Sequence, residues 1–152
     1  MSCNENKHHS SSYCVADVVK FINELQDCST STCGSGCEIP FLGAHNSASV
    51  ANTRPFILYT KIGTPFETFA PGPGNYPNCK SQIFRVESVD DDSCAVLRAL
   101  TVVDHTPPTP PRDLTTCDFL NDSTTTLRAT STCITVDLSY FCGIQCLRDV
   151  SI

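Results

Sequence analysis

The stretch that most constrains the fold is 133–146, which reads CITVDLSYFCGIQC. Apolar residues occupy every second position from Ile134 to Leu138, and polar residues lie between them. A period of two is typical of a strand with one buried face. Cys142 and Cys146 are four residues apart, so we expect them on the same side of this last strand. The chain therefore carries several thiols on a β-rich core element.

Other strand-like segments lie along the chain. They are separated by connections, some of them rich in proline or glycine, such as 71–79 and 104–113. Their number and spacing predict roughly six to eight strands. The segment 94–103 is apolar at both alternate positions, which predicts a central strand covered on both faces. We expect a mainly β (α+β) fold: a single-domain antiparallel β-sandwich or barrel-like core with one N-terminal amphipathic helix.

That helix is predicted over residues 13–26, where apolar side chains follow the i, i+3, i+4, i+7 spacing of one helical face. A loop rich in serine, threonine and glycine is predicted at 27–38. Residues 1–12 contain no apolar run and are expected to form a flexible N-terminal arm. Residues 13–152 are then a single cysteine-rich domain.

Composition excludes several classes of protein. The formal net charge is −6 and the ten Lys and Arg residues are scattered, which disfavours nucleic-acid binding. No apolar run is long enough for a signal peptide or for membrane insertion. Eleven cysteines are more than a domain of this size needs for folding, and an odd number leaves at least one thiol for another partner.

The loop at 27–38 contains Cys28, Cys33 and Cys37, and these residues could bind zinc together with a fourth ligand, which Cys14, Cys79 or His45 could supply. We favour a disulfide-stapled loop instead, because the chain has no C-x2-C pair. No redox, phosphate-binding or metalloprotease motif is present, so we expect no catalytic residue and no cofactor. Cys14 falls in the first helical turn, where the helix dipole favours a thiolate, or else it is a small buried apolar residue.

Several motifs of the chain resemble one known family. They are IFRVE at 83–87, the cysteine motif of 133–147, MSCNENKHH at 1–9, and the runs 18–28 and 33–45. Together they resemble the spore coat Y/Z family of Bacillus-type endospores, and most closely its exosporium branch. Tyr140 and Gly143 depart from the family pattern, in which we expect Cys and Ala.

The resemblance implies a structural protein and not an enzyme. It implies self-assembly of the chain into a ring, expected to be a hexamer, and of rings into a hexagonal two-dimensional lattice cross-linked by disulfides. It places the protein at the spore surface, in the exosporium basal layer or outer coat, beside other coat proteins, after synthesis without a signal peptide in the mother-cell cytoplasm. A zinc-binding module is the alternative, and a thiol enzyme a remote one.

Within that interpretation, Cys3 on the arm and Cys14 on the helix are candidates for bonds between protomers. Cys142 and Cys146 are candidates for internal bonds to the middle strands. The further disulfide candidates are Cys28, Cys33, Cys37, Cys79, Cys94, Cys117 and Cys133.

Overall fold

The computed structural model describes residues 14–30, 51–72 and 79–152, without the side chains of 28–30. In chain order the elements are α1 (Cys14–Thr30), β1 (Phe56–Thr60), β2 (Thr68–Phe69), β3 (Lys80–Ser81), β4 (Ile83–Val89), β5 (Cys94–Asp104), α2 (Thr116–Asn121), β6 (Thr125–Asp137), the 3-10 turn η1 (Leu138–Tyr140) and β7 (Phe141–Cys146).

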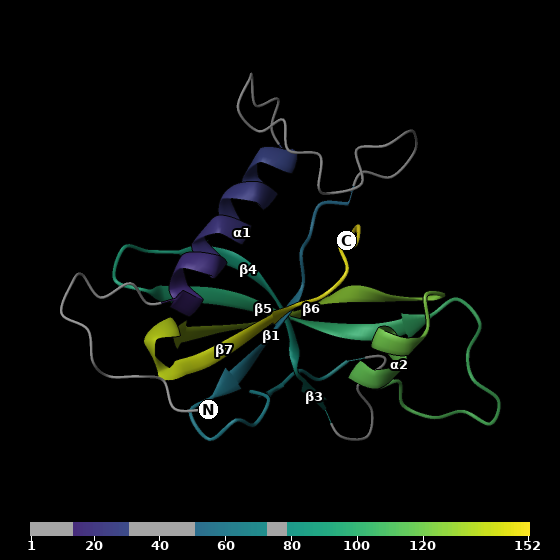
Figure 1. The fold of residues 1–152 in the computed structure, drawn as a ribbon. Coiled ribbons are helices and arrows are strands. Elements are labelled where there is room, and N and C mark those ends of the chain that lie inside the picture. The colour runs from purple at the N-terminus through teal and green to yellow at the C-terminus, as the bar shows by residue number, and fades with distance from the viewer. Residues whose placement is uncertain (1–13, 31–50, 73–78) are drawn as a thin grey trace.

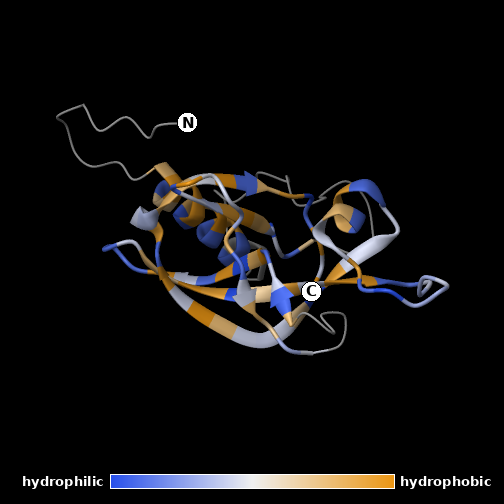
Figure 2. Cartoon of the chain, turned by 90° about the horizontal axis from the view of Figure 1, so that it is seen from below, coloured by the Kyte–Doolittle hydropathy of each residue, from blue (hydrophilic) through white to orange (hydrophobic). Residues whose placement is uncertain are grey.

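Five strands form one antiparallel sheet in the order β6-β5-β4-β1-β7, and β2 pairs with β3 in a small second sheet (Figure 1). The mainly β fold with an antiparallel core and an N-terminal helix is therefore confirmed. Apolar and polar residues are interspersed along the strands (Figure 2), as a sheet with two differently covered faces requires.

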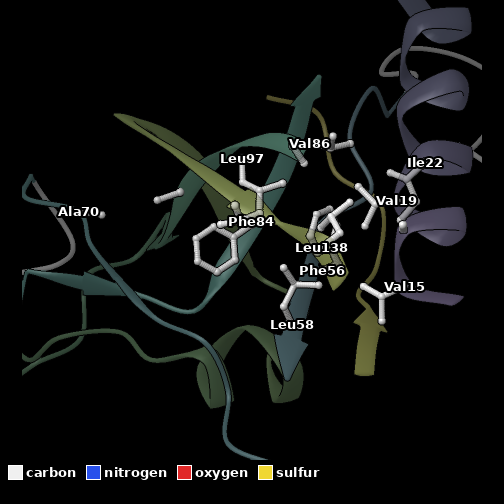
Figure 3. Close-up of a cluster of buried hydrophobic side chains, with 14 residues drawn as sticks. Val15, Val19, Ile22, Phe56, Leu58, Ala70, Phe84, Val86, Leu97 and Leu138 are labelled. Carbon is white, nitrogen blue, oxygen red and sulfur yellow. The ribbon is translucent and has the colours of Figure 1, made fainter. Parts of the chain in front are cut away.

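Helix α1 covers one face of this sheet. Its apolar stripe includes Val15, Val19 and Ile22, all buried (Figure 3). The sheet residues of the same cluster are Phe56, Leu58, Phe84, Val86, Ala95, Leu97, Ala99, Val136 and Leu138. The helix continues to Thr30, beyond the predicted end, so the backbone of Cys28 belongs to α1 and not to a loop.

Within the described ranges, the opposite face is covered at one end only. A second cluster there joins Ile57, Ile83, Leu100, Val102, Phe119, Leu127, Leu147 and Val150. Phe119 comes from α2, a short helix that the sequence analysis did not predict. A capping box starts it: the Thr115 hydroxyl accepts from the Asp118 amide, and the Asp118 carboxylate accepts from the Thr115 amide. The Arg148 guanidinium lies 3.7 Å from the Phe119 ring centroid and holds α2 against the sheet.

Because of this uneven cover, the prediction for the strand at 94–103 is correct only for its second half. From Ala99 to Val102 every residue of β5 is buried, so both faces are covered there. In the first half Cys94 is exposed, and Val96 and Arg98 are only partly buried. The sheet face opposite α1 is therefore open to solvent around these residues.

Tight turns follow β1 and β4. After β1 the Thr60 amide donates to the Thr64 carbonyl at 2.9 Å, and Gly63 between them has φ +83°. The returning chain pairs with β1 at the single bridge between Tyr59 and Pro65, and β2 pairs with β3. Between β4 and β5 the Asp90 carboxylate accepts from the amides of Asp92 and Cys94, which identifies Asp90 as a turn residue.

Candidate functional site

The features of the described chain that the fold does not require are its exposed thiols. Five cysteines are exposed and free: Cys14 on α1, Cys94 on β5, Cys117 on α2, Cys133 on β6 and Cys146 on β7. A buried position for Cys14 is therefore wrong, and its place in the first turn of α1 is confirmed. Cys79 and Cys142 are partly buried. Cys3, Cys33, Cys37 and His45, and the Cys28 side chain, lie outside the described residues.

Cys94 and Cys133 lie on the same open face of the sheet. Cys94 is directly opposite Asp137, and Cys133 is directly opposite Arg98. Residues directly opposite each other point to the same face, and four positions separate Cys94 from Arg98 along β5. That offset is about 13 Å along the strand, well beyond the Cα separation of about 7 Å that a disulfide allows. These two thiols cannot bond to each other in this register.

Arg98 gives Cys133 a defined charged neighbour. The Arg98 Nε donates to a Glu87 carboxylate oxygen at 2.6 Å, and its Nη1 donates to the Thr130 carbonyl at 3.0 Å. The hydrogen bond to Glu87 raises the pKa of Arg98, burial opposes this, and the charges of Glu87 and of the Cys133 sulfur add to it. Cys133 is therefore an exposed thiol whose charged neighbour is held in place by two hydrogen bonds.

Cys146 has a different environment. Burial raises the pKa of the Cys146 thiol, the positive charge of Arg54 opposes this, and the carboxylate of Asp149 adds to it. Arg54 and Asp149 are themselves joined by two hydrogen bonds, at 2.8 and 2.9 Å. The charge of Arg54 is therefore largely engaged with the carboxylate, so burial remains the largest influence on the Cys146 thiol.

The strand that carries Cys142 and Cys146 is not regular. The register of β7 with β1 shifts between Tyr59 and Thr60, so β7 holds one extra residue at Cys142. Phe141 and Ile144 are three positions apart, yet both pack against the cluster under α1. The Cys142 thiol donates to the Thr60 carbonyl at 3.2 Å. A bulge thus separates the two cysteines.

A hollow of about 400 Å³ lies between strands β3 to β5 and the segment 113–116. Apolar side chains of Ile83, Leu100 and Val102 contribute to its lining, and Glu67 at its rim is paired with Lys80 at 2.8 Å. The described lining residues include neither cysteine nor histidine. The described part of this hollow therefore contains no Cys–His pair.

Sequence reasoning found the cysteines but missed their charged neighbours. Arg98 and Cys133 are 35 positions apart by residue number, and only the register of β5 with β6 brings them together. Within the described ranges, no group of three or more His, Cys, Asp or Glu residues is arranged to hold a metal ion. The same part of the chain contains no helix both long and apolar enough to cross a membrane.

Comparison with known proteins identifies the family. The family model described as Spore coat protein Z matches residues 1–149. The chain belongs to the spore coat protein Z family. A member from Bacillus subtilis (strain 168), Spore coat protein Z, is 35% identical over 143 residues, which cover 90% of each chain. No solved structure matches.

Membership in the spore coat protein Z family places this chain at the spore surface, in a structural role in the coat. It agrees with the resemblance found from the sequence motifs. A structural role also agrees with the geometry, in which exposed thiols are distributed over α1, α2 and three strands of one sheet. A coat protein needs contacts with its neighbours, and the thiols are chemically suited to make them.

Proposed function

We propose that this coat protein assembles with copies of itself into a two-dimensional layer, and that disulfides between copies make the layer permanent. The single observation that carries the proposal is the presence of five exposed, free thiols on five different elements. A cysteine that serves the core of its own chain is normally buried. Thiols on the surface of several elements are instead positioned to reach other molecules.

Each cross-link needs an oxidant, and a small-molecule disulfide supplies the chemistry. A protein thiolate attacks one sulfur of that disulfide and releases a small thiol. The thiolate of a neighbouring copy then attacks the mixed disulfide, forms the protein–protein bond and releases the second small thiol. Two protein thiols are oxidised and one small disulfide is reduced to two thiols. The bond prevents dissociation on dilution, because every further contact becomes intramolecular.

A layer also needs a defined geometry of contacts. A closed ring gives one heterologous interface, and a second kind of contact between rings extends the assembly in a plane. We propose a hexameric ring, packed hexagonally, in the exosporium basal layer or the outer coat, with other coat proteins bound to it. Cys3 and Cys14 are our first candidates for bonds between copies, and the exposure of Cys14 supports its place. Cys94, Cys117, Cys133 and Cys146 join them because they are exposed as well.

Oxidation of the purified protein tests this proposal. The reduced chain is incubated with an oxidised small thiol, then imaged by negative stain and analysed in detergent without reductant. We expect an ordered layer and covalent oligomers that reductant converts to single chains. A matched sample whose thiols are first alkylated should give no covalent oligomers. Single chains in the untreated sample, with no layer in the images, would contradict the proposal.

A further inference from the structure

The open edge of β6 has a backbone arrangement suited to pairing with another strand. Strand β6 lies at one end of the sheet order, and among the described strands only β5 pairs with it. The Leu138 amide donates to the Ser93 carbonyl at 2.9 Å, which shows that Leu138 bonds toward β5. Alternate residues direct their amides and carbonyls to opposite sides of a strand. Cys133, Thr135 and Asp137 therefore direct theirs away from the sheet.

Only this half of β6 is suited to such a contact. The register with β5 is unbroken from Asp137 to Cys133, but it shifts between Arg98 and Leu100, where residues 130–132 of β6 are irregular. Irregular segments and charged residues protect an edge strand from pairing, and the irregular segment and Arg128 do so for the first half. The second half contains no lysine, proline or glycine, and its one charged residue, Asp137, lies at its end. The rest of it is left without this protection.

We propose that residues 133–137 of β6 pair antiparallel with the same residues of a second copy, about a two-fold axis at Thr135. This inference rests on the proposed self-assembly and names one of its contacts. The two Thr135 residues then lie opposite each other, and Cys133 lies opposite the partner's Asp137. Each copy donates the outward amides of Cys133, Thr135 and Asp137 to the other. The contact is self-complementary, as a two-fold interface must be.

Two features identify a second copy as the partner. The first is the apolar layer under α1: Ile134 is partly exposed at its border and Val136 is nearly buried. In the proposed register Ile134 lies opposite the partner's Val136, so the layer continues across the axis. The second feature is charge. Asp137 of one copy lies in the same row as Arg98 of the other, about 10 Å away across Cys133, whereas the two Asp137 residues are four positions apart along the strands, so opposite charges lie nearer than like charges.

The pairing does not itself depend on a disulfide. Cys133 and the Cys94 of the other copy share one row of the extended sheet but are two strands apart, a spacing of about 10 Å. This exceeds the separation that a disulfide spans. The strand contact is therefore expected to form in the reduced protein. Its failure can then be separated from a failure of disulfide cross-linking.

Sedimentation of the reduced full-length protein tests the contact. We expect the wild type to self-associate, and Thr135→Pro to weaken that association on the order of tenfold or more, because each copy loses one outward amide. The pairing of β5 with β6 is retained, since the Thr135 amide does not donate to β5. Thr135→Ala keeps the amide and should associate like the wild type. Equal weakening by Thr135→Ala and Thr135→Pro would overturn the proposal.

A second variant tests the register even if Thr135→Pro folds poorly. The proposed axis places the two introduced thiols of Thr135→Cys about 5.5 Å apart at Cα, within disulfide range. After oxidation of a mixture of isotopically light and heavy chains, we expect position 135 bonded to position 135 of the other isotope. Ser88→Cys, exposed on β4 of the same sheet, is the control and should form no such symmetric bond. Absence of the 135–135 bond overturns the register.

The two proposals fail in different ways. A wild-type protein that stays monomeric in reductant at high concentration, yet forms covalent oligomers on oxidation, overturns the strand contact and leaves cross-linking intact. In the other case, the protein associates in reductant and Thr135→Pro weakens this association, but no disulfides form between copies on oxidation. That result supports the strand contact and overturns cross-linking.

Discussion

Cys133 lies directly opposite Arg98 on the open face of the sheet, and Glu87 and the Thr130 carbonyl fix the Arg98 guanidinium beside it. The pair joins an exposed thiol to a permanent positive charge on a rigid element. Cys133 is exposed, so a thiol of another copy can reach it beside this fixed charge.

We expect Arg98→Gln to slow the alkylation of Cys133 by an anionic reagent at low ionic strength, because the positive charge that attracts the reagent is lost. Peptide mass spectrometry of the reduced protein, with brief exposure to iodoacetate, measures this rate at each cysteine. Arg128→Gln is the matched control, since it removes an exposed arginine from the same strand. An unchanged alkylation rate of Cys133 in Arg98→Gln would show that the Arg98 charge does not influence the reaction of this thiol.

For Cys146 we expect two substitutions to act in opposite directions. Asp149→Asn removes a negative charge and releases Arg54, so the pKa of the Cys146 thiol should fall. Arg54→Gln removes the opposing positive charge, so the same pKa should rise. The pH dependence of Cys146 alkylation measures both, with Asp92→Asn as a distant control. No shift in either variant would show that burial alone governs the pKa of this thiol, and shifts of the same sign would contradict the opposite effects of the two charges.

The core under α1 makes a prediction about stability. Phe84 is fully buried and stacks on Phe66 with ring centroids 5.6 Å apart, whereas Phe69 is 69% exposed. We expect Phe84→Ala to lower the free energy of unfolding by about 3–5 kcal/mol. Phe69→Ala should change it by less than about 0.5 kcal/mol. Urea unfolding of the reduced protein compares them, and similar losses in both variants would contradict this placement of the core.

At helix α2, the stability of the fold is expected to depend on pH through Asp118. Hydrogen bonds from Arg112, and then from the Thr115 amide and hydroxyl, hold the pKa of Asp118 well below its usual range. A carboxyl with a lowered pKa in the folded state stabilises the fold above its unfolded value, near pH 4, and this contribution is lost as the pH falls toward its folded value. We expect Asp118→Asn to cost about 1 kcal/mol at neutral pH, mainly through the capping box.

The exposed Arg112 adds little to that cost, because solvent screens its ion pair. The stability difference between Asp118→Asn and the wild type should shrink as the pH is lowered below about 4. Thermal unfolding at several pH values measures this trend, with Asp92→Asn as the control. A difference that stays constant with pH would show that the Asp118 charge is not involved.

The sequence predicted those parts of the fold that depend on neighbours along the chain. The spacing of Val15, Val19 and Ile22 indicated α1, and the alternation after Cys133 indicated β6. Local signals also existed for α2, in the Thr115–Asp118 capping box. A helix of six residues is too short for an apolar period to become visible, and it was missed for that reason.

What the sequence did not predict depends on how strands are paired. The bulge at Cys142 appears only when β7 is aligned with β1, and the contact of Cys133 with Arg98 requires the register of β5 with β6. A shift of one residue would turn Cys133 to the other face of the sheet. The thiols could therefore be named from the sequence, but their surroundings could not.

The most direct test of the central claim is to mix reduced chains of two isotopic compositions in equal amounts, oxidise the assembled protein, and map its disulfides by mass spectrometry without reduction. We expect cross-linked peptides that contain one light and one heavy half, including pairs formed by the exposed cysteines of the sheet. Disulfides found only within chains of a single isotope, or exposed thiols that remain reduced in an ordered layer, would contradict the claim that sulfur joins neighbouring copies.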